Sequence, residues 1–460
     1  MQPYDRSMED FLDAVCGQVR LKTVHSSIKD ELSDHIACLK DEYISEGMDA
    51  ENASLKALQQ MRDPVLIGRQ LNQAHSPKIE WSILVLALVL TGIGGFVQFF
   101  LSTVSPNNAQ AFSNFLIYAP LGIAAFAFTY FFDYMLIGRY SKLVYFSLMA
   151  AAILGFFILA RIHGAYRHIY YYALLFMPAF SGVIYGLRNK GYFGIIISGI
   201  FYTGGAIMCL LAPTFSGLLF ITIGCLVILT SAINRGYFGG SKRAGLAIVY
   251  IPTLAVTAAC ISALYGPLAR RFSFMMHPEA DPNGYGYQHL MVKRLISSSR
   301  PLGKAVLDGD MAGMDIHRLL PGWQTDFTLT YVFSSLGYIA GLAIIAVMLL
   351  LIIRMFGVAA KQKNAFGFLL SLSCCIAITG QIVFYVLSNT GVIVMDGILP
   401  FVSYGGTGFA VNMMLTGLLL SAYRRTNLVK DVLKSGACSS QIFTLADGKL
   451  IIDLGIKKQK

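Results

Sequence analysis

Hydrophobic and polar residues alternate in long blocks along this chain, and the blocks from Trp81 onward have the length of membrane spans. Ten apolar segments follow one another, near residues 82–104, 114–137, 142–160, 169–187, 193–211, 215–233, 245–266, 327–353, 365–388 and 402–423. About 20 apolar residues let a helix cross the hydrocarbon core of a bilayer. We therefore expect an all-α, polytopic membrane domain of about ten transmembrane helices over residues 81–424.

The first 80 residues have a different pattern, with apolar positions at helical spacing among many charges. In "SSIKDELSDHIACLKDEYISEG", Ile28, Leu32, Ile36 and Leu39 fall on one helical stripe. The stretches "AENASLKALQQM" and "RDPVLIGRQLNQAH" predict two further helices. Residues 1–80 are thus predicted to form a small cytoplasmic prefix domain of three helices. They contain no cluster of catalytic residue types, so we expect a packing or regulatory role.

Composition and charge agree with a membrane protein. The chain is 55% hydrophobic and 13% charged, where a soluble domain has roughly 25% charged residues. The net charge of +11 does not indicate a nucleic-acid partner, because the basic residues are scattered between apolar segments. The positive-inside rule instead predicts that both termini are cytoplasmic, with residues 425–460 as a basic cytoplasmic tail. The short loops that this orientation places inside contain Arg139, Lys142, Arg188, Lys190, Arg235, Lys242, Arg243, Arg354, Lys361 and Lys363.

One long interruption, residues 267–326, then lies outside the membrane. Loops of this length are usually functional or disordered, and its aromatic residues argue against disorder. Its stretch "GYQHLMVKRLI" is predicted to form an amphipathic helix at the membrane surface. The eight cysteines of the chain include no CxxC pair and lie mostly inside apolar segments. They predict neither a disulfide framework nor a zinc site.

Four strings in the last two hundred residues form a specific combination. They are "RRFSFMMHPEADPNGYGYQ", "TDFTLTYVFSSLGYIAGL", "GQIVFYVLSNTG" and "DGILPFVSYGGTGFAVNMMLTGLLLSAYRR". With them the chain resembles the SEDS family, the RodA/FtsW/SpoVE-type proteins of bacterial cell-wall synthesis. It departs from the family pattern at several positions. Ser334 and Ser335 stand where two acidic residues are usual, and His168 stands where tryptophan is usual.

The resemblance implies a peptidoglycan glycosyltransferase that polymerises glycan strands from lipid II and releases undecaprenyl pyrophosphate. Asp326 matches the family's essential aspartate and would be the catalytic base, although an aspartate at this position could also cap the next helix. The glycines of "SYGG" could likewise serve close packing rather than substrate binding. The predicted substrate-binding residues are Arg167, Arg271, Lys304, Gln288, Ser403, Tyr404, Gly405 and Gly406.

The resemblance also implies partners and a location. These are a class B penicillin-binding transpeptidase, membrane lipids and the bacterial cell membrane. It leaves open a divalent cation, Mg²⁺ or Mn²⁺, as cofactor, but the sequence predicts no metal ligands. Two alternatives compete with the polymerase. A lipid II flippase would also place about ten helices around a lipid, and a catalytically inactive scaffold for a transpeptidase would account for the missing acidic residues.

Overall fold

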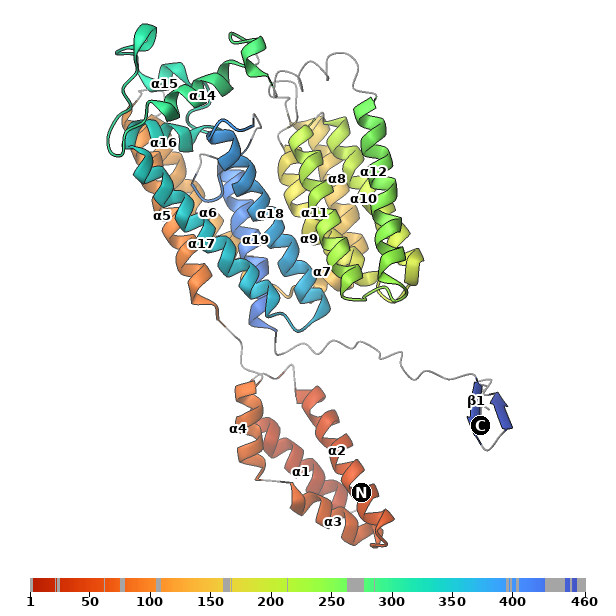
Figure 1. Cartoon of the computed structure of the whole chain (residues 1–460). Helices are drawn as coiled ribbons and strands as arrows, with labels where there is room; N and C mark the ends of the chain where they lie inside the picture. Colours follow the sequence, from red (N-terminus) through yellow and green to blue (C-terminus); the bar gives the residue numbers. More distant parts are fainter. Residues whose placement is uncertain are drawn as a thin grey trace.

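The long helices of this protein pack around two central ones, α9 (His168–Gly186) and α18 (Ala365–Asn389) (Figure 1). Within their apolar windows, 72% of α9 and 67% of α18 is buried in protein, against 6% for α6 (Ala109–Phe131). The computed structural model describes residues 3–20, 22, 25–61, 63–74, 79–104, 109–159, 166, 168–212, 214–262, 277–284, 286–393, 397, 399–402, 405–426, 443–446 and 449–452.

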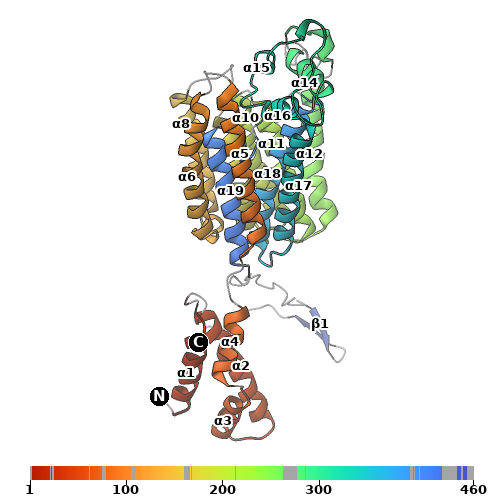
Figure 2. The same ribbon diagram turned by 90° about the vertical axis from the view of Figure 1, so that its left-hand side faces the viewer.

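The all-α membrane fold is confirmed, and the chain is a multi-pass membrane protein. The remaining long helices are α5 (Trp81–Val104), α8 (Ser141–Ile158), α10 (Gly191–Leu211), α11 (Phe215–Asn234), α12 (Lys242–Ser262), α17 (Tyr338–Ala360) and α19 (Gly406–Arg424). Within the described ranges, eight helices are long and apolar enough to cross a membrane, namely α5, α6, α8, α9, α10, α11, α17 and α18. The helices α12 and α19 are not among these eight, but both lie in the same bundle (Figure 2). The predicted number of ten transmembrane helices therefore stays a prediction.

Two of the expected segments are each divided in the structure. In the segment near 114–137, α6 ends at Phe131 and a separate short helix, α7 (Met135–Arg139), follows. In the turn between them the Met135 amide donates to Asp133 Oδ1. The segment near 327–353 consists of α16 (Thr328–Leu336) and α17, which meet at Gly337. Hydropathy alone could not find these breaks, since both halves are apolar.

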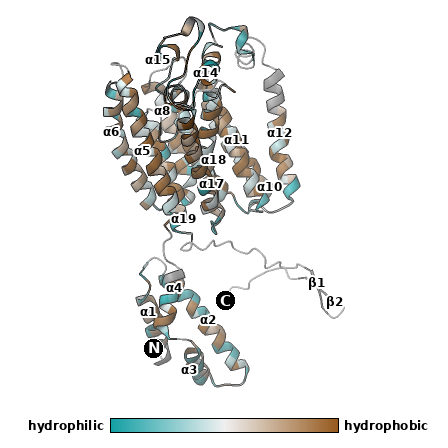
Figure 3. Ribbon diagram, turned by 60° about the vertical axis from the view of Figure 1, so that its left-hand side comes forward, coloured by the Kyte–Doolittle hydropathy of each residue, from teal (hydrophilic) through white to brown (hydrophobic). Residues whose placement is uncertain are grey.

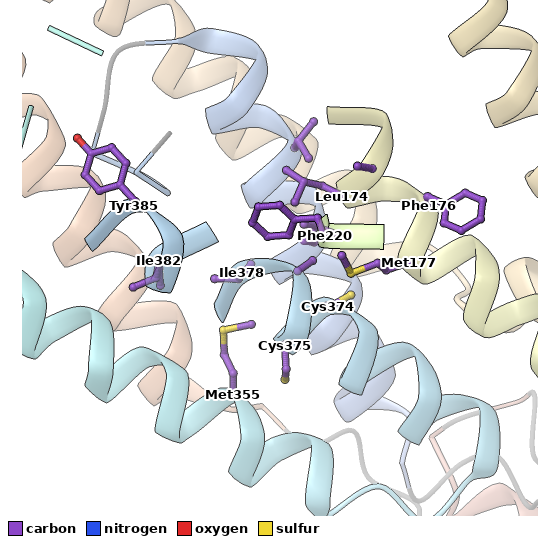
Figure 4. Packing of buried hydrophobic residues seen from close by; sticks show 14 of the residues in the cluster. Leu174, Phe176, Met177, Phe220, Met355, Cys374, Cys375, Ile378, Ile382 and Tyr385 are labelled. Atoms are coloured by element: carbon purple, nitrogen blue, oxygen red, sulfur yellow. The ribbon is translucent and has the colours of Figure 1, made fainter. Parts of the chain in front are cut away.

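The centre of the bundle is a continuous hydrophobic core. Figure 4 shows buried side chains of this core from four helices: Leu174, Phe176 and Met177 of α9, Phe220 of α11, Met355 of α17, and Cys374, Cys375 and Ile378 of α18. The two cysteines are fully buried thiols that pack as small hydrophobic residues. This core fixes α18, whose C-terminal end contributes to the candidate site.

A polar cap covers the end of the bundle opposite to the end where α5 starts and α19 finishes (Figure 1). It contains the 3₁₀ helices η3 (Pro278–Ala280) and η4 (Gly309–Met311) and the helices α14 (Tyr287–Ser297) and α15 (Ile316–Leu319). The predicted helix at "GYQHLMVKRLI" is confirmed as α14, with Met291, Val292 and Leu295 buried. Figure 3 shows the contrast between the hydrophobic bundle and the more hydrophilic prefix helices.

The prefix contains four helices rather than the three expected. They are α1 (Pro3–Gly17), α2 (His25–Ser45), α3 (Ala50–Gln60) and α4 (Pro64–Ala74). The missed helix, α1, supplies Val15 and Cys16 to a small core with Val19 and Ile28. In the tail, which the sequence did not predict to be structured, strands β1 (Phe443–Ala446) and β2 (Lys449–Ile452) pair antiparallel. The division into a prefix domain, a membrane domain and a tail stays a prediction.

Small residues let α19 approach α6 closely. A Cβ atom added at Gly417 of α19 would lie 2.0 Å from Thr129 Oγ1 and 2.7 Å from the Phe126 carbonyl oxygen of α6. Because lipid is as apolar as the helix surfaces, helices associate in a membrane largely through such close packing. Gly417 is therefore expected to be essential for the α6–α19 contact.

We expect Gly417→Val to destabilise the protein by about 1–3 kcal/mol, because the added atoms have no room and must displace backbone. Thermal unfolding in detergent measures this. Gly199→Val in α10 is the matched control, since a Cβ at Gly199 meets nothing within 4 Å. Equal midpoints for the two variants would contradict the packing argument.

Candidate functional site

Asp326 lies where the cap joins the membrane bundle, immediately before α16. Its side chain is half-buried, and the nearby residues Trp323 and Phe327 are buried. The Trp323 ring packs against Tyr331 of α16 with ring centroids 4.7 Å apart. Phe327 occupies the N-cap position of α16, so Asp326 precedes the cap. The assigned N-cap is thus Phe327, and both roles of Asp326, helix cap and catalytic base, stay predictions.

Asn389, the last residue of α18, holds the backbone around Asp326. Its Nδ2 donates to the Asp326 carbonyl oxygen at 2.9 Å and to the Tyr385 carbonyl oxygen at 3.0 Å. Its Oδ1 accepts from the Thr330 amide at 2.9 Å and lies 3.0 Å from Thr330 Oγ1. Asn389 and Thr330 are completely buried. A buried amide with its hydrogen-bonding groups satisfied in this way fixes the position of both segments it joins.

Tyr385, one turn earlier on α18, contacts the same segment. Its hydroxyl accepts from the Leu329 amide at 3.3 Å and donates to the Thr325 carbonyl oxygen at 3.4 Å. Two side chains of one helix therefore tie down the residues on both sides of Asp326. The string "GQIVFYVLSNTG" contains Tyr385 and Asn389, but the sequence analysis predicted no role for them or for Thr330. A polar side chain inside an apolar run was the available signal for all three.

Lys304 lies in a loop that runs along the other end of α16. The amides of its neighbours Gly303 and Ala305 donate to the carbonyl oxygens of Leu336 and Ser334, at 3.1 and 2.7 Å. Lys304 itself is exposed. A helix of nine residues is about 13 Å long. The structure therefore places Lys304 and Asp326 at opposite ends of α16 rather than in contact.

The described residues of the segment before α19 are buried and contact α5. Leu399, Phe401 and Val402 are 1–2% exposed, and Gln98 of α5 donates to the Val402 carbonyl oxygen at 3.1 Å. Phe401 has a positive φ of 67°, which is a strained conformation for a non-glycine residue. Gln98 is a polar residue in an apolar span that holds the segment before α19, and the sequence analysis did not identify it.

The structure gives different reasons for a glycine at position 405 and at position 406. Gly405 is the N-cap of α19 and has a φ of 147°. A Cβ at Gly406 would lie 2.5 Å from the Tyr118 ring of α6. The close-packing interpretation thus has support at Gly406, and substrate contact by either glycine stays a prediction. Gln288 is half-buried on α14. Arg167, Arg271, Ser403 and Tyr404 lie outside the described residues.

The cap also contains a cavity of about 330 Å³. It holds charges of both signs and two hydroxyl groups, and is lined by Arg294, Ser297, Ser298, Leu307, Asp308 and Met311. In the part of the chain that the structure describes, no group of three or more His, Cys, Asp or Glu side chains could hold a metal ion. Mg²⁺ or Mn²⁺ as a cofactor therefore stays a prediction that no cluster of described side chains supports.

Comparison with known proteins identifies the family. The model of the FtsW, RodA and SpoVE family, described as "Cell cycle protein", matches residues 188–428, which is just over half of the chain. The chain belongs to the SEDS family. The matched region of this SEDS protein contains Asp326, the cap and the chain before α19.

Relatives of this SEDS protein are similar over part of its length. The probable peptidoglycan glycosyltransferase FtsW of Trichlorobacter lovleyi is 30% identical over 155 residues, 33% of this chain and 39% of that protein. The peptidoglycan glycosyltransferase MrdB of Escherichia coli K12 is 30% identical over 165 residues, 35% and 44% of the two chains. Stage V sporulation protein E of Bacillus subtilis is 30% identical over 158 residues, 34% and 42%. The chain thus covers less than half of the length of these relatives.

Solved structures extend the similarity to the whole bundle. A chain of a peptidoglycan synthase complex has a TM-score of 0.60 at 17% identity, over 76% of this SEDS protein and 98% of that chain. A mutant of the rod shape determining protein RodA of Thermus thermophilus has a TM-score of 0.51 at 15% identity, over 75% and 97%. At these identities the comparison shows the fold alone.

In this SEDS protein a pair of buried amides joins α18 to α19. Gln381 Nε2 donates to Asn412 Oδ1 at 2.8 Å, and Asn412 Nδ2 donates to Gln381 Oε1 at 3.2 Å. The pair also donates to the carbonyl oxygens of Ala377 and Gly408 in the preceding turns. The two amides satisfy each other where no water is available, so each is expected to depend on the other.

We expect Asn412→Leu alone to destabilise the protein by about 1–3 kcal/mol, because the Gln381 amide then stays buried without its partner. The double variant Gln381→Met/Asn412→Leu should recover most of this loss, since both groups are then apolar. A double-mutant cycle of thermal unfolding measures the coupling. Additive losses would show that the two amides do not act as a pair.

His289 gives the cap a pH-dependent stability. It is 4% exposed, and its Nδ1 has no hydrogen-bond partner among the described residues. Burial, and next the charge of Lys293, lower the pKa of His289 below its ordinary value near 6.5. The folded protein then binds fewer protons here than the unfolded chain. The stabilisation is therefore complete above the unfolded pKa and decreases as the pH falls through it.

We expect the thermal midpoint of the wild type to decrease more than that of His289→Phe between about pH 7.5 and about pH 5.5, because phenylalanine does not titrate. Thermal scans at several pH values measure this. The exposed His277 provides the control variant, His277→Gln. A pH dependence unchanged in His289→Phe would show that other groups cause it.

Proposed function

We propose that this SEDS protein is a peptidoglycan glycosyltransferase that polymerises glycan strands from lipid II. The observation that carries this proposal is the position of Asp326, which lies in the family-matched region, half-buried at the edge of the bundle. The relatives named above support it, since two of them are named peptidoglycan glycosyltransferases. The proposal concerns the activity of the whole chain, although the relatives match only part of it.

In the proposed reaction Asp326 acts as general base. Its carboxylate accepts the proton from the 4-hydroxyl of the acceptor lipid II, whose oxygen attacks the anomeric carbon of the donor. The new C–O bond forms as the bond from the anomeric carbon to the pyrophosphate oxygen breaks. Undecaprenyl pyrophosphate leaves with the electron pair and the anomeric centre is inverted. A carboxylate is suited to this step when it is ionised and within reach of the hydroxyl.

The charge of the leaving pyrophosphate requires nearby cations. Lys304, at the other end of α16, is proposed as one of these cations and lies within the described residues. Arg167 and Arg271 are proposed as further cations on their sequence match alone. An extended substrate that crosses α16 would contact both Asp326 and Lys304. Gln288, Ser403, Tyr404, Gly405 and Gly406 are proposed as further contacts to the sugars, the peptide or the phosphates.

The proposed orientation places both termini in the cytoplasm and the cap outside. Support comes from the end of the bundle where α19 finishes. There Arg425 pairs with Asp133 at 2.5 Å, and Arg188 and Arg235 stack on Tyr185 and Phe368. Cytoplasmic loops are enriched in such basic residues. The reaction would then take place on the outer side of the bacterial cell membrane, where the strands are assembled.

We also propose a class B penicillin-binding transpeptidase as partner, with membrane lipids around the bundle. The solved peptidoglycan synthase complex, in which polymerization and crosslinking are coordinated, supports this by its similar fold. Such a partner would crosslink the strands that this protein releases.

We expect Asp326→Asn to lower the rate of strand formation by about 100-fold or more, because the amide cannot accept the proton in the transition state. The assay supplies labelled lipid II to the purified protein with a candidate transpeptidase, and gel electrophoresis resolves the strands. Glu279→Gln, at an exposed acidic residue of the cap, is the control.

Three other results would change the assignment. Equal strands from Asp326→Asn and wild type would exclude Asp326 as base. No strands from the wild type with any transpeptidase would favour the scaffold, which the buried Ser334 and Ser335 in place of acidic residues make plausible. Lipid II translocation in liposomes that persists in Asp326→Asn would favour the flippase.

A further inference from the structure

The contacts of α18 with the Asp326 segment form a regular pattern. In an α-helix the amide of residue i+4 donates to the carbonyl oxygen of residue i. The Tyr331 amide does this with Phe327 at 2.9 Å, and the bond belongs to the start of α16. The two preceding pairs of this kind would be Leu329 with Thr325 and Thr330 with Asp326. In both pairs, a side chain of α18 forms hydrogen bonds with the amide of one residue and with the carbonyl oxygen of the other.

The Asn389 amide lies between Asp326 and Thr330. It donates to the Asp326 carbonyl oxygen and accepts from the Thr330 amide, both at 2.9 Å. The Tyr385 hydroxyl lies in the same way between Thr325 and Leu329, at 3.4 and 3.3 Å. Residues 385 and 389 are one helical turn apart, so both project from the same face of α18. Each side chain thus replaces one helical hydrogen bond.

We propose that Asn389 and Tyr385 are positioning residues that prevent α16 from extending back through Asp326. Because each satisfies both the donor and the acceptor of an opened pair, the turn can stay non-helical in a buried setting without unpaired backbone groups. The backbone at Asp326 is thereby fixed one residue before the N-cap, Phe327. The direction of the Asp326 carboxylate follows from this backbone.

The surroundings make this arrangement rigid. Asn389, Thr330 and Tyr385 are all 0% exposed, and Figure 4 shows Tyr385 on the same helix as the core residues Ile378 and Ile382. The other end of α16 is held by the loop of Lys304, whose neighbours donate to the Ser334 and Leu336 carbonyl oxygens. The helix therefore cannot shift along its axis to compensate for a change at Asp326. When the inserted side chains are removed, the backbone amides and carbonyl oxygens of this segment can find partners by forming the direct helical hydrogen bonds.

This proposal rests on the proposed function only in its consequence for activity, since the geometry can be tested independently. The principal variant is Tyr385→Phe/Asn389→Ala, which removes both inserted groups. We expect the structure of this variant, determined by cryo-electron microscopy with a bound antibody fragment, to show α16 starting at or before Asp326. An α16 that still begins at Thr328 would overturn the proposal, whatever the activity.

The activity of the same variant gives the second readout. A catalytic group displaced by about 1 Å can cost on the order of 100-fold in rate, and we expect this loss in kcat with a smaller change in KM. Asn389→Asp retains the acceptor for Thr330 but adds a negative charge beside Asp326. A neighbouring like charge raises the pKa of a carboxyl group, so the acid limb of the pH–rate profile should move to higher pH.

Gln381→Met is the matched control, because it removes a buried amide from the same helix two turns away from the Asp326 segment. It is expected to lower the thermal midpoint and to leave the pH–rate profile unchanged. Equal effects of Gln381→Met and the Asn389 variants on kcat and on the profile would overturn the positioning role. Absence of strands from the wild type would instead contradict the proposed function, and the structure of the variant would then decide the positioning proposal.

Discussion

Backbone groups at the ends of membrane helices must find partners within the protein, and the cap end of this molecule is organised around that constraint. In hydrocarbon an unsatisfied amide or carbonyl group costs several kcal/mol. Among the described residues, the chain nevertheless breaks at places near the cap, including before α16, between α16 and α17, and before α19. Each break has partners from a distant part of the sequence. The site is built from these breaks.

The break between α16 and α17 shows how closely the partners fit. The amides of Tyr338 and Ile339, at the start of α17, donate to the carbonyl oxygens of Arg300 and Pro301. The Pro301 oxygen lies 2.5 Å from the position of a Cβ at Gly337, and Gly337 has a φ of 100°, so a glycine is required there on both grounds. The same loop contains Lys304. A structural requirement of the helix break therefore also sets the position of a proposed substrate-binding cation.

The helices of the bundle are buried to different extents. The helices α9 and α18 are buried along most of their length, whereas α6 faces outward except where glycines bring it against α19. Because α18 is held by the core, the side chains at its C-terminal end have fixed positions against the segment that joins the cap to α16. Precise placement of a catalytic group is more easily achieved from such a helix than from a loop alone. Asp326 lies in an irregular segment, but its backbone is tied to α18, one of the two most buried of the candidate membrane spans among the described residues.

The sequence by itself determined the membrane fold, the family, the helix at "GYQHLMVKRLI" and the selection of Asp326, because these depend on local hydropathy and on contiguous motifs. It placed Asp326 as a possible cap and read residues 327–353 as one span, since hydropathy records apolar residues and not hydrogen bonds. Only the tertiary structure decided where α16 begins. That boundary depends on Tyr385 and Asn389, which are about sixty residues away in the chain and reach Asp326 only after α18 has packed into the core.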